Sequence, residues 1–143
     1  MRINTKIRYG LRTMIELACN DEPGGILQKE IAEKQNLSNK YLDSIVSSLK
    51  AKGLIVNAKG KGSGYKLTKP ACQISMYEIY TAFEPVTVVE CTENSEYCEL
   101  FSCCSATHFW TELKTEMIDF LKSKTLKDVA RKEKPCKNFQ EQA

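Results

Sequence analysis

The stretch that most constrains the fold of this chain is residues 28–68, which combines two helical patterns with two strand patterns. Apolar residues recur at helical spacing over residues 28–35 and again over residues 39–52, so we predict two helices joined by a tight turn. Ser38 suits the N-cap of the second helix, because its hydroxyl can accept a hydrogen bond from a free backbone N–H. Gly53 suits the end of that helix, because glycine readily adopts a left-handed conformation.

A basic, glycine-rich turn separates the two predicted strands. Residues 54–56 and 65–68 have strand character, and residues 59–64 between them contain two lysines and three glycines. A helix, a helix–turn–helix pair and a basic hairpin, in this order, are typical of a winged helix–turn–helix, in which the second paired helix enters the major groove of DNA. A nucleotide-binding P-loop is the alternative, but its sequence pattern is absent and the turn joins two strands.

Helical patterns before and after this stretch complete a mainly α-helical fold with a small β-hairpin wing. Residues 4–20 form one apolar face at helical spacing, and turn residues at 21–25 end the pattern. Ser75 and Glu78 have the spacing of a capping box, which predicts the start of a fourth helix over residues 76–83.

The longest predicted helix, residues 105–123, has little of a small winged-helix domain to pack against. Its apolar stripe consists of Trp110, Leu113, Met117, Phe120 and Leu121. Pairing with the same helix of a second chain would bury this stripe, so the sequence predicts a two-fold dimer. A dimer also agrees with the way in which helix–turn–helix proteins read two DNA half-sites.

The charge of the chain is unevenly distributed. Residues 1–70 hold 13 Lys and Arg against 6 Asp and Glu, whereas residues 71–104 hold six glutamates and no Lys or Arg. The basic N-terminal half favours a polyanionic partner, and we expect double-stranded DNA. The sequence has no run of about 18 apolar residues and no signal-peptide pattern at its start, so we expect no membrane partner and a cytoplasmic protein.

Soft metal ligands are concentrated in residues 91–108, which contain four of the seven cysteines and the only histidine, His108. An odd number of cysteines in a reducing compartment favours metal binding or redox sensing over a disulfide framework. The residues leave three chemistries open: an iron–sulfur cluster, a structural zinc site, and a thiol switch without metal. Cys19, on the first helix, is predicted to be buried, whereas Cys72 and Cys136 are isolated and are not predicted to be ligands.

An enzyme is the contrasting class of function. The chain has no CxxC redox pair, and a catalytic Cys–His pair would have to use His108 beside four thiols. A disulfide reductase or an electron carrier would also have no use for a basic wing. We therefore predict that the chain is not an enzyme.

As a set, these features resemble the Rrf2 (Rrf-two) family of transcriptional regulators over residues 1–130. The matching residues are Met1, Arg2, Ile3, Arg8, Tyr9, Gly10, Leu11, Ile31, Ala32, Leu37, Ser38, Tyr41, Leu42, Gly53, Leu54, Lys59, Gly60, Gly64, Tyr65 and the spaced cysteines before Trp110. The resemblance implies a dimeric DNA-binding regulator that senses iron–sulfur or redox status. Its iron–sulfur cluster, 2Fe–2S or in some members 4Fe–4S, is held in the loop before the dimer helix.

The resemblance also implies which positions contact DNA. On this chain they fall on the second paired helix and the wing: Ser38, Asn39, Lys40, Tyr41, Asp43, Ser44, Lys59 and Lys61. Lys59 replaces the arginine that the family usually carries in the wing, and Ser63 interrupts the usual pair of glycines. The operator preference is therefore expected to differ from that of typical members.

For the cluster, the Cys-x5-Cys-x5-Cys spacing common in the family implies three ligands: Cys91, Cys98 and Cys104. The first interval is one residue longer in this chain, and the neighbouring Cys103 competes with Cys104. His108, our choice for the fourth ligand, would share a helical face with Cys104 but comes one residue later than the family's histidine. The alternatives for the fourth place are Cys103, Glu90 and a carboxylate of the partner subunit. Some members use an acidic residue at the position of Arg8, which cannot serve here.

These expectations divide the chain into four parts. Residues 1–84 form a winged helix–turn–helix domain, and residues 85–104 form a cysteine-rich cluster-binding loop. Residues 105–130 form a dimerisation helix region, and residues 131–143 form a flexible tail.

Overall fold

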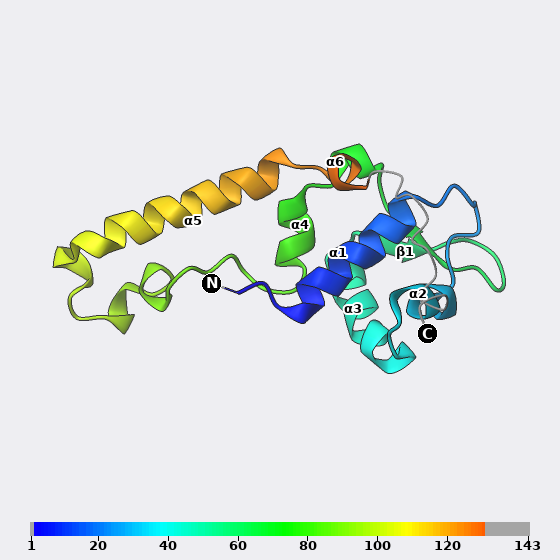
Figure 1. The fold of residues 1–143 in the computed structure, drawn as a ribbon, viewed down its shortest axis with the longest axis horizontal. Coiled ribbons are helices and arrows are strands. Elements are labelled where there is room, and N and C mark those ends of the chain that lie inside the picture. The colour runs from blue at the N-terminus through cyan, green and yellow to red at the C-terminus, as the bar shows by residue number, and fades with distance from the viewer. Residues whose placement is uncertain (1, 131–143) are drawn as a thin grey trace, which may run out of the picture.

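The structure is a computed structural model that describes residues 2–130; the tail predicted at residues 131–143 lies outside the described residues. Its helices and strands are α1 (Thr5–Ala18), α2 (Gln28–Gln35), α3 (Asn39–Ala51), β1 (Ile55–Asn57), β2 (Tyr65–Leu67), α4 (Met76–Thr81), α5 (Ser105–Ser123) and α6 (Leu126–Val129). Four short 3-10 turns are η1 (Ala71–Gln73), η2 (Glu90–Thr92), η3 (Ser95–Tyr97) and η4 (Phe101–Cys103). Figure 1 shows α1 to α4, the hairpin and α6 gathered into one body, from which residues 85–124 extend as an arm.

The two paired helices form where the sequence predicts them. α3 presents one buried apolar face to the core, formed by Leu42, Ile45, Val46 and Leu49. The Tyr41 N–H donates a hydrogen bond to the Ser38 hydroxyl at 3.1 Å, which confirms the predicted N-cap. After the last turn of the helix, Gly53 adopts a φ of 77°, in the left-handed region that glycine tolerates.

α4 begins at the predicted capping box. The Glu78 N–H donates to the Ser75 hydroxyl at 3.1 Å, and the Ser75 N–H donates to the Glu78 carboxylate at 2.8 Å. The helix ends at Thr81, two residues before the predicted end. Phe83 instead packs on α1 at Gly10, where an added Cβ would lie 2.3 Å from two carbons of the Phe83 ring.

The wing is an antiparallel hairpin whose strands lie within one residue of the predicted strands. Ile55 pairs with Leu67 and Asn57 pairs with Tyr65. The hydroxyl of Ser63 contacts the carbonyl oxygens of Ala58 and Gly60. The residue that departs from the family's usual glycine pair therefore closes the turn by bonding to its backbone.

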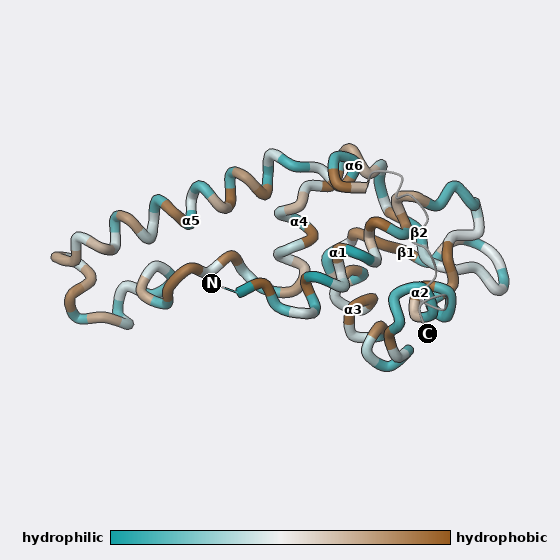
Figure 2. Tube along the Cα trace, viewed as in Figure 1, coloured by the Kyte–Doolittle hydropathy of each residue, from teal (hydrophilic) through white to brown (hydrophobic). Residues whose placement is uncertain are grey.

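The long helix α5 packs on the body only through its C-terminal part. Met117, Ile118 and Leu121 contact a small cluster on α1, α4 and the following loop, whose buried members are Ile7, Tyr80 and Val86. No residue of α5 is buried, and Figure 2 shows hydrophobic segments recurring along it between polar ones. Met117 and Leu121 of the predicted apolar stripe are thus partly covered by their own chain, and pairing of the stripe with a second chain stays a prediction. Among residues 2–130, no helix has both the length and the apolar character needed to cross a membrane.

The short helix α6 brings the chain back to the body. Leu126 is fully buried in the main core, and its N–H donates to the Ile74 carbonyl at 2.8 Å. The Met76 N–H donates to the Lys124 carbonyl at 2.8 Å, so the start of α4 lies beside the end of the arm. The arm is therefore attached to the body at both of its ends.

Candidate functional site

The outer face of α3 carries most of the side chains predicted to contact DNA. Four of them are exposed, namely Ser38, Asn39, Lys40 and Asp43. The other two, Tyr41 and Ser44, are half-buried. The Ser44 hydroxyl donates to the Tyr41 carbonyl at 2.8 Å, so it is turned back toward its own helix. The face is polar and accessible, as a helix that reads base edges requires.

Tyr41 connects this face to α1. Its ring meets the ring of Tyr9 edge-on, with the ring centres 6.0 Å apart, and the Arg12 guanidinium lies 5.3 Å from the centre of the Tyr9 ring. Tyr41 is thus partly a packing residue, while Arg12 adds a cation near the candidate interface. The sequence pattern gave no sign of this stacking.

The wing adds further positive charge. Lys59 and Lys61 are exposed in its turn. At its base, the Lys50 ammonium of α3 lies 4.7 Å from the centre of the Tyr65 ring of β2, a cation–π contact between helix and hairpin. Together these cations give the hairpin side of α3 the character of a phosphate-binding surface.

The cysteine loop, residues 91–104, runs back along α5 as a series of 3-10 turns without a buried residue. Cys91, Cys98 and Cys104 are half-buried free thiols, and Cys103 is an exposed free thiol. The Glu93 carboxylate pairs with the Lys114 ammonium, which fixes the start of the loop to the middle of α5.

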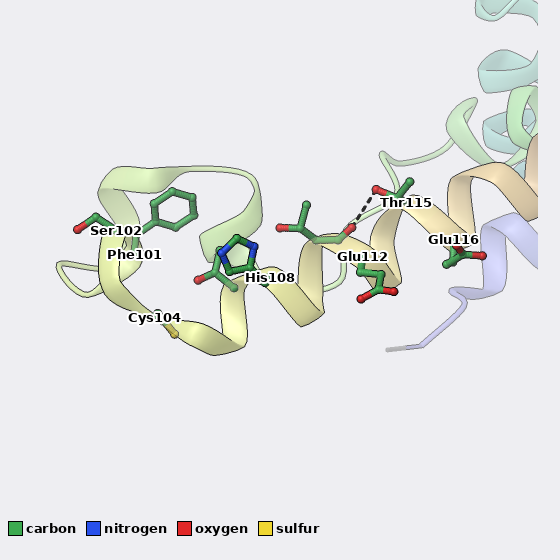
Figure 3. A pocket seen from close by; sticks show the side chains of 9 residues that line it. Phe101, Ser102, Cys104, His108, Glu112, Thr115 and Glu116 are labelled. Atoms are coloured by element: carbon green, nitrogen blue, oxygen red, sulfur yellow. Dashed lines mark hydrogen bonds between the residues drawn. The ribbon is translucent and has the colours of Figure 1, made fainter.

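Cys104 is the N-cap of α5, and its thiol has an unusual environment. The side chain and the N–H of Thr107 and the N–H of Ala106, all in the first turn of α5, lower the pKa of Cys104 because they stabilise the thiolate. Figure 3 shows Cys104 at the start of α5 with His108, Glu112 and Glu116 following along the helix, beside Phe101 and Ser102 of the preceding turn. His108 is exposed and lies one helical turn after Cys104.

The predicted cysteine ligands share one loop and His108 follows on α5, but these side chains are not gathered into a single site. Within the part of the chain that the structure describes, no three His, Cys, Asp or Glu side chains are grouped closely enough to hold a metal ion. The donor set itself, four thiols and one imidazole, has the chemistry that iron–sulfur clusters and zinc both accept. The assignment of Cys91, Cys98, Cys104 and His108 as ligands therefore stays a prediction.

Comparison with known proteins identifies the family. The family model Rrf2, described as an iron-dependent transcriptional regulator, matches residues 3–132. The chain belongs to the Rrf2 family. It is a DNA-binding transcriptional regulator and not an enzyme, as the sequence predicts.

Relatives of this Rrf2 protein are recognisable over most of its length. The regulator IscR of Cronobacter sakazakii is 33% identical over 127 residues, which cover 88% of this chain and 78% of IscR. CymR, the global cysteine regulator of B. subtilis, has a structure that superimposes with a TM-score of 0.74 at 34% identity, covering 91% of this chain and 96% of CymR. The oxidized form of Staphylococcus aureus CymR gives a TM-score of 0.73 at 36% identity, covering 94% and 99%. These similarities confirm the winged-helix fold.

Two findings on this Rrf2 regulator depart from the sequence interpretation. Cys19 is exposed and not buried, because it follows the last residue of α1 and lies beyond the buried turn. Three long-range contacts had no signal in the sequence: Gln28 with Asp43, Glu93 with Lys114, and Asn4 with Glu84.

Proposed function

We propose that this Rrf2 regulator binds a pseudo-palindromic operator as a homodimer and that the cysteine loop controls its affinity for DNA. The observation that carries the proposal is the attachment of this loop region to the DNA-binding body. Glu84, next to the first residue of the arm, accepts a hydrogen bond from the Asn4 amide at 2.7 Å, and the Asn4 side chain also caps α1. A movement of the loop therefore has a direct route to the first helix of the body.

In the proposed complex, α3 lies in the major groove and the wing contacts the backbone or the minor groove. Base contacts come from the six predicted positions at the start of α3, and phosphate contacts come from Lys59 and Lys61. The six positions are Ser38, Asn39, Lys40, Tyr41, Asp43 and Ser44. Dimerisation through the exposed part of α5 is supported by two large apolar side chains, Phe109 and Phe120, which are 58% and 62% exposed. Covering them against a second copy would remove apolar surface from water.

The Lys59→Ala variant is expected to bind operator DNA more weakly and to lower the slope of log Kd against log salt by about 1, because one phosphate contact is lost. Fluorescence anisotropy at several salt concentrations measures both quantities. Lys127→Ala on α6 is the matched control, since it removes the same charge from a different element of the body. Equal salt slopes for wild type and Lys59→Ala would remove the wing from the model.

For the sensor, we propose an iron–sulfur cluster held by Cys91, Cys98 and Cys104, with His108 as the fourth ligand and Cys103 as its alternative. A bound cluster would supply sensitivity to iron, oxygen or redox state. The protein's own part is to bring thiolates together from a loop that has no buried residue, so that assembly need not disrupt the core. The free energy of cluster binding would then order the loop and shift its contacts with α5, through Glu93 and Lys114, and with the body, through Glu84 and Asn4.

Anaerobic purification followed by absorption spectroscopy and analysis of iron, sulfide and zinc tests the cofactor. We expect visible charge-transfer bands with iron and sulfide; colourless protein with stoichiometric zinc would support a structural site instead. Operator affinity is then measured at matched salt before and after removal of the cluster. A large difference is expected, and equal affinities would remove the sensor proposal. A single half-site bound as tightly as the full palindrome would contradict the dimer.

A metal-free thiol switch is the second candidate. The exposed free thiol of Cys103 next to Cys104 favours it, because the pKa of Cys104 is lowered and the thiolate is the form that reacts with oxidants. This candidate predicts that oxidation of metal-free protein changes operator affinity and that a thiol reductant restores it. The cluster proposal predicts no such reversible change in the metal-free protein.

A further inference from the structure

Gln28, the first residue of α2, sits where three elements of the body meet. Its amide nitrogen donates to the Asp43 carboxylate of α3 and to the Asn39 carbonyl at 3.3 Å. Its amide oxygen accepts a hydrogen bond from the Tyr65 hydroxyl of β2 at 3.2 Å. One side chain thus joins the first helix of the helix–turn–helix pair, the helix proposed to read bases, and the wing.

The chemistry of these partners fixes the orientation of the Gln28 amide. Asp43 and the Asn39 carbonyl offer only acceptors, so they require the NH2 group, whereas the Tyr65 hydroxyl can donate to the oxygen. A flipped amide would place its oxygen against a carboxylate and a carbonyl. The network therefore forms in one orientation of the amide, which uses both N–H groups of Gln28 and one acceptor site of its oxygen.

The consequence falls on Asp43. Its side chain is exposed on the outer face of α3, and only one of its two oxygens takes a hydrogen bond from the residues that the structure describes. The second oxygen is left to accept from a base donor, such as the cytosine N4 amino group in the major groove. A carboxylate held in one rotamer by a neutral donor loses less freedom on binding and tolerates fewer misaligned partners.

The wing end of the network is also fixed. The Tyr65 backbone pairs with Asn57 and bridges Ile26, and the Tyr65 ring carries the Lys50 ammonium at 4.7 Å. Gln28 is therefore bonded to a residue of the hairpin that is itself held from two sides. Through Gln28, the Asp43 side chain on α3 is therefore held at a fixed position relative to the wing.

We propose that Gln28 is a positioning residue that sets base discrimination by Asp43 and couples it to the wing. The inference rests on the proposed docking of α3 in the major groove. Gln28 lies on α2, outside the helix and the wing that face the DNA. Its replacement is expected to affect recognition at one base position and not the overall affinity.

The test uses the full-length protein and the best duplex that the wild type selects from a library of randomised sequences. Kd is measured for that duplex and for each of its single-base variants, with wild type, Gln28→Leu, Gln28→Glu, Tyr65→Phe and Asp43→Ala. We expect Gln28→Leu to reduce discrimination by about three- to tenfold at the same base pair that Asp43→Ala affects. The Gln28→Leu/Asp43→Ala double variant is expected to show the same discrimination as Asp43→Ala alone at that base pair. Gln28→Glu keeps the size of the side chain but places a carboxylate beside Asp43, so it should lose discrimination as well.

Tyr65→Phe removes only the hydroxyl and keeps the ring beneath Lys50, so a smaller loss at the same base pair is expected. Thermal unfolding of each variant separates positioning from folding. A Gln28→Leu variant that weakens all duplexes equally, or that keeps wild-type discrimination while Asp43→Ala loses it, would overturn the inference and leave the docking intact. Unchanged discrimination in Asp43→Ala would count against the docking itself and would overturn the inference with it.

Discussion

The Gly64→Ala variant is expected to unfold at a temperature roughly 10 °C below that of the wild type, from a loss of about 3 kcal/mol in the free energy of unfolding. A Cβ at Gly64 would lie 2.1 Å from the carbonyl carbon of Ile26 and 2.5 Å from the amide nitrogen of Leu27. These are backbone atoms, which cannot rotate away as a flexible side chain can. Thermal unfolding followed by circular dichroism measures the shift. Operator affinity should fall as well, because β2 and the wing turn must move to relieve the clash.

Gly24→Ala is the matched control for this variant. Gly24 belongs to the neighbouring turn, its φ is not positive, and nothing lies within 4 Å of a Cβ built on it. Its replacement is expected to change the free energy of unfolding by less than about 1 kcal/mol. If the two variants melted at the same temperature, the close approach of the wing to residues 26 and 27 would be wrong.

The Cys98→Ser variant is expected to retain only a small part of the bound iron, sulfide and visible absorbance of anaerobically purified wild type. Cys98 is the central cysteine of the proposed ligands, and unlike Cys104 it has no neighbouring cysteine to replace it. A serine hydroxyl stays protonated at neutral pH and is a harder ligand than a thiolate, so it holds iron–sulfur clusters poorly. The operator affinity of the variant should equal that of wild type after removal of the cluster.

Cys72→Ser controls for the loss of a thiol as such. Cys72 is exposed in η1, outside the cysteine loop, and is not a proposed ligand. Its replacement is expected to leave iron, sulfide and absorbance unchanged. Wild-type amounts of iron and sulfide in Cys98→Ser would exclude the proposed ligand set, whatever the result for Cys72→Ser.

Much of the body could be predicted because its determinants are local. The N-cap at Ser38, the capping box of Ser75 and Glu78, and the left-handed Gly53 each depend on residues within a few positions of one another. The hairpin could be placed for the same reason, since its turn and both strands lie within a short stretch. The periodicity of α3 further identified which side faces the core and hence which side is presented outward.

The remainder depends on contacts that periodicity does not encode. The stripe of α5 shows that one face is apolar, but it does not say that Met117 and Leu121 pack on α4 while Phe120 stays exposed. Gln28 reaches partners 15 and 37 residues away, and in the sequence it reads only as the start of a short helix. The spacing of thiols gives candidate ligands, but it carries no information on how the 3-10 turns of the loop place those thiols relative to one another.

The return of the chain at Leu126 changes how the arm transmits motion. A helix attached to the body at one end could rotate freely about that end, and a displacement of its far end would reach the body through one attachment alone. Here the chain leaves beside Glu84 and comes back beside the start of α4, and α6 packs on α1 as well. Because the arm is attached to the body at two points, a tilt of the arm would compress one attachment and stretch the other. In the proposed mechanism, such a linkage would pass a small shift of the cysteine loop to α1, the helix against which α3 is packed.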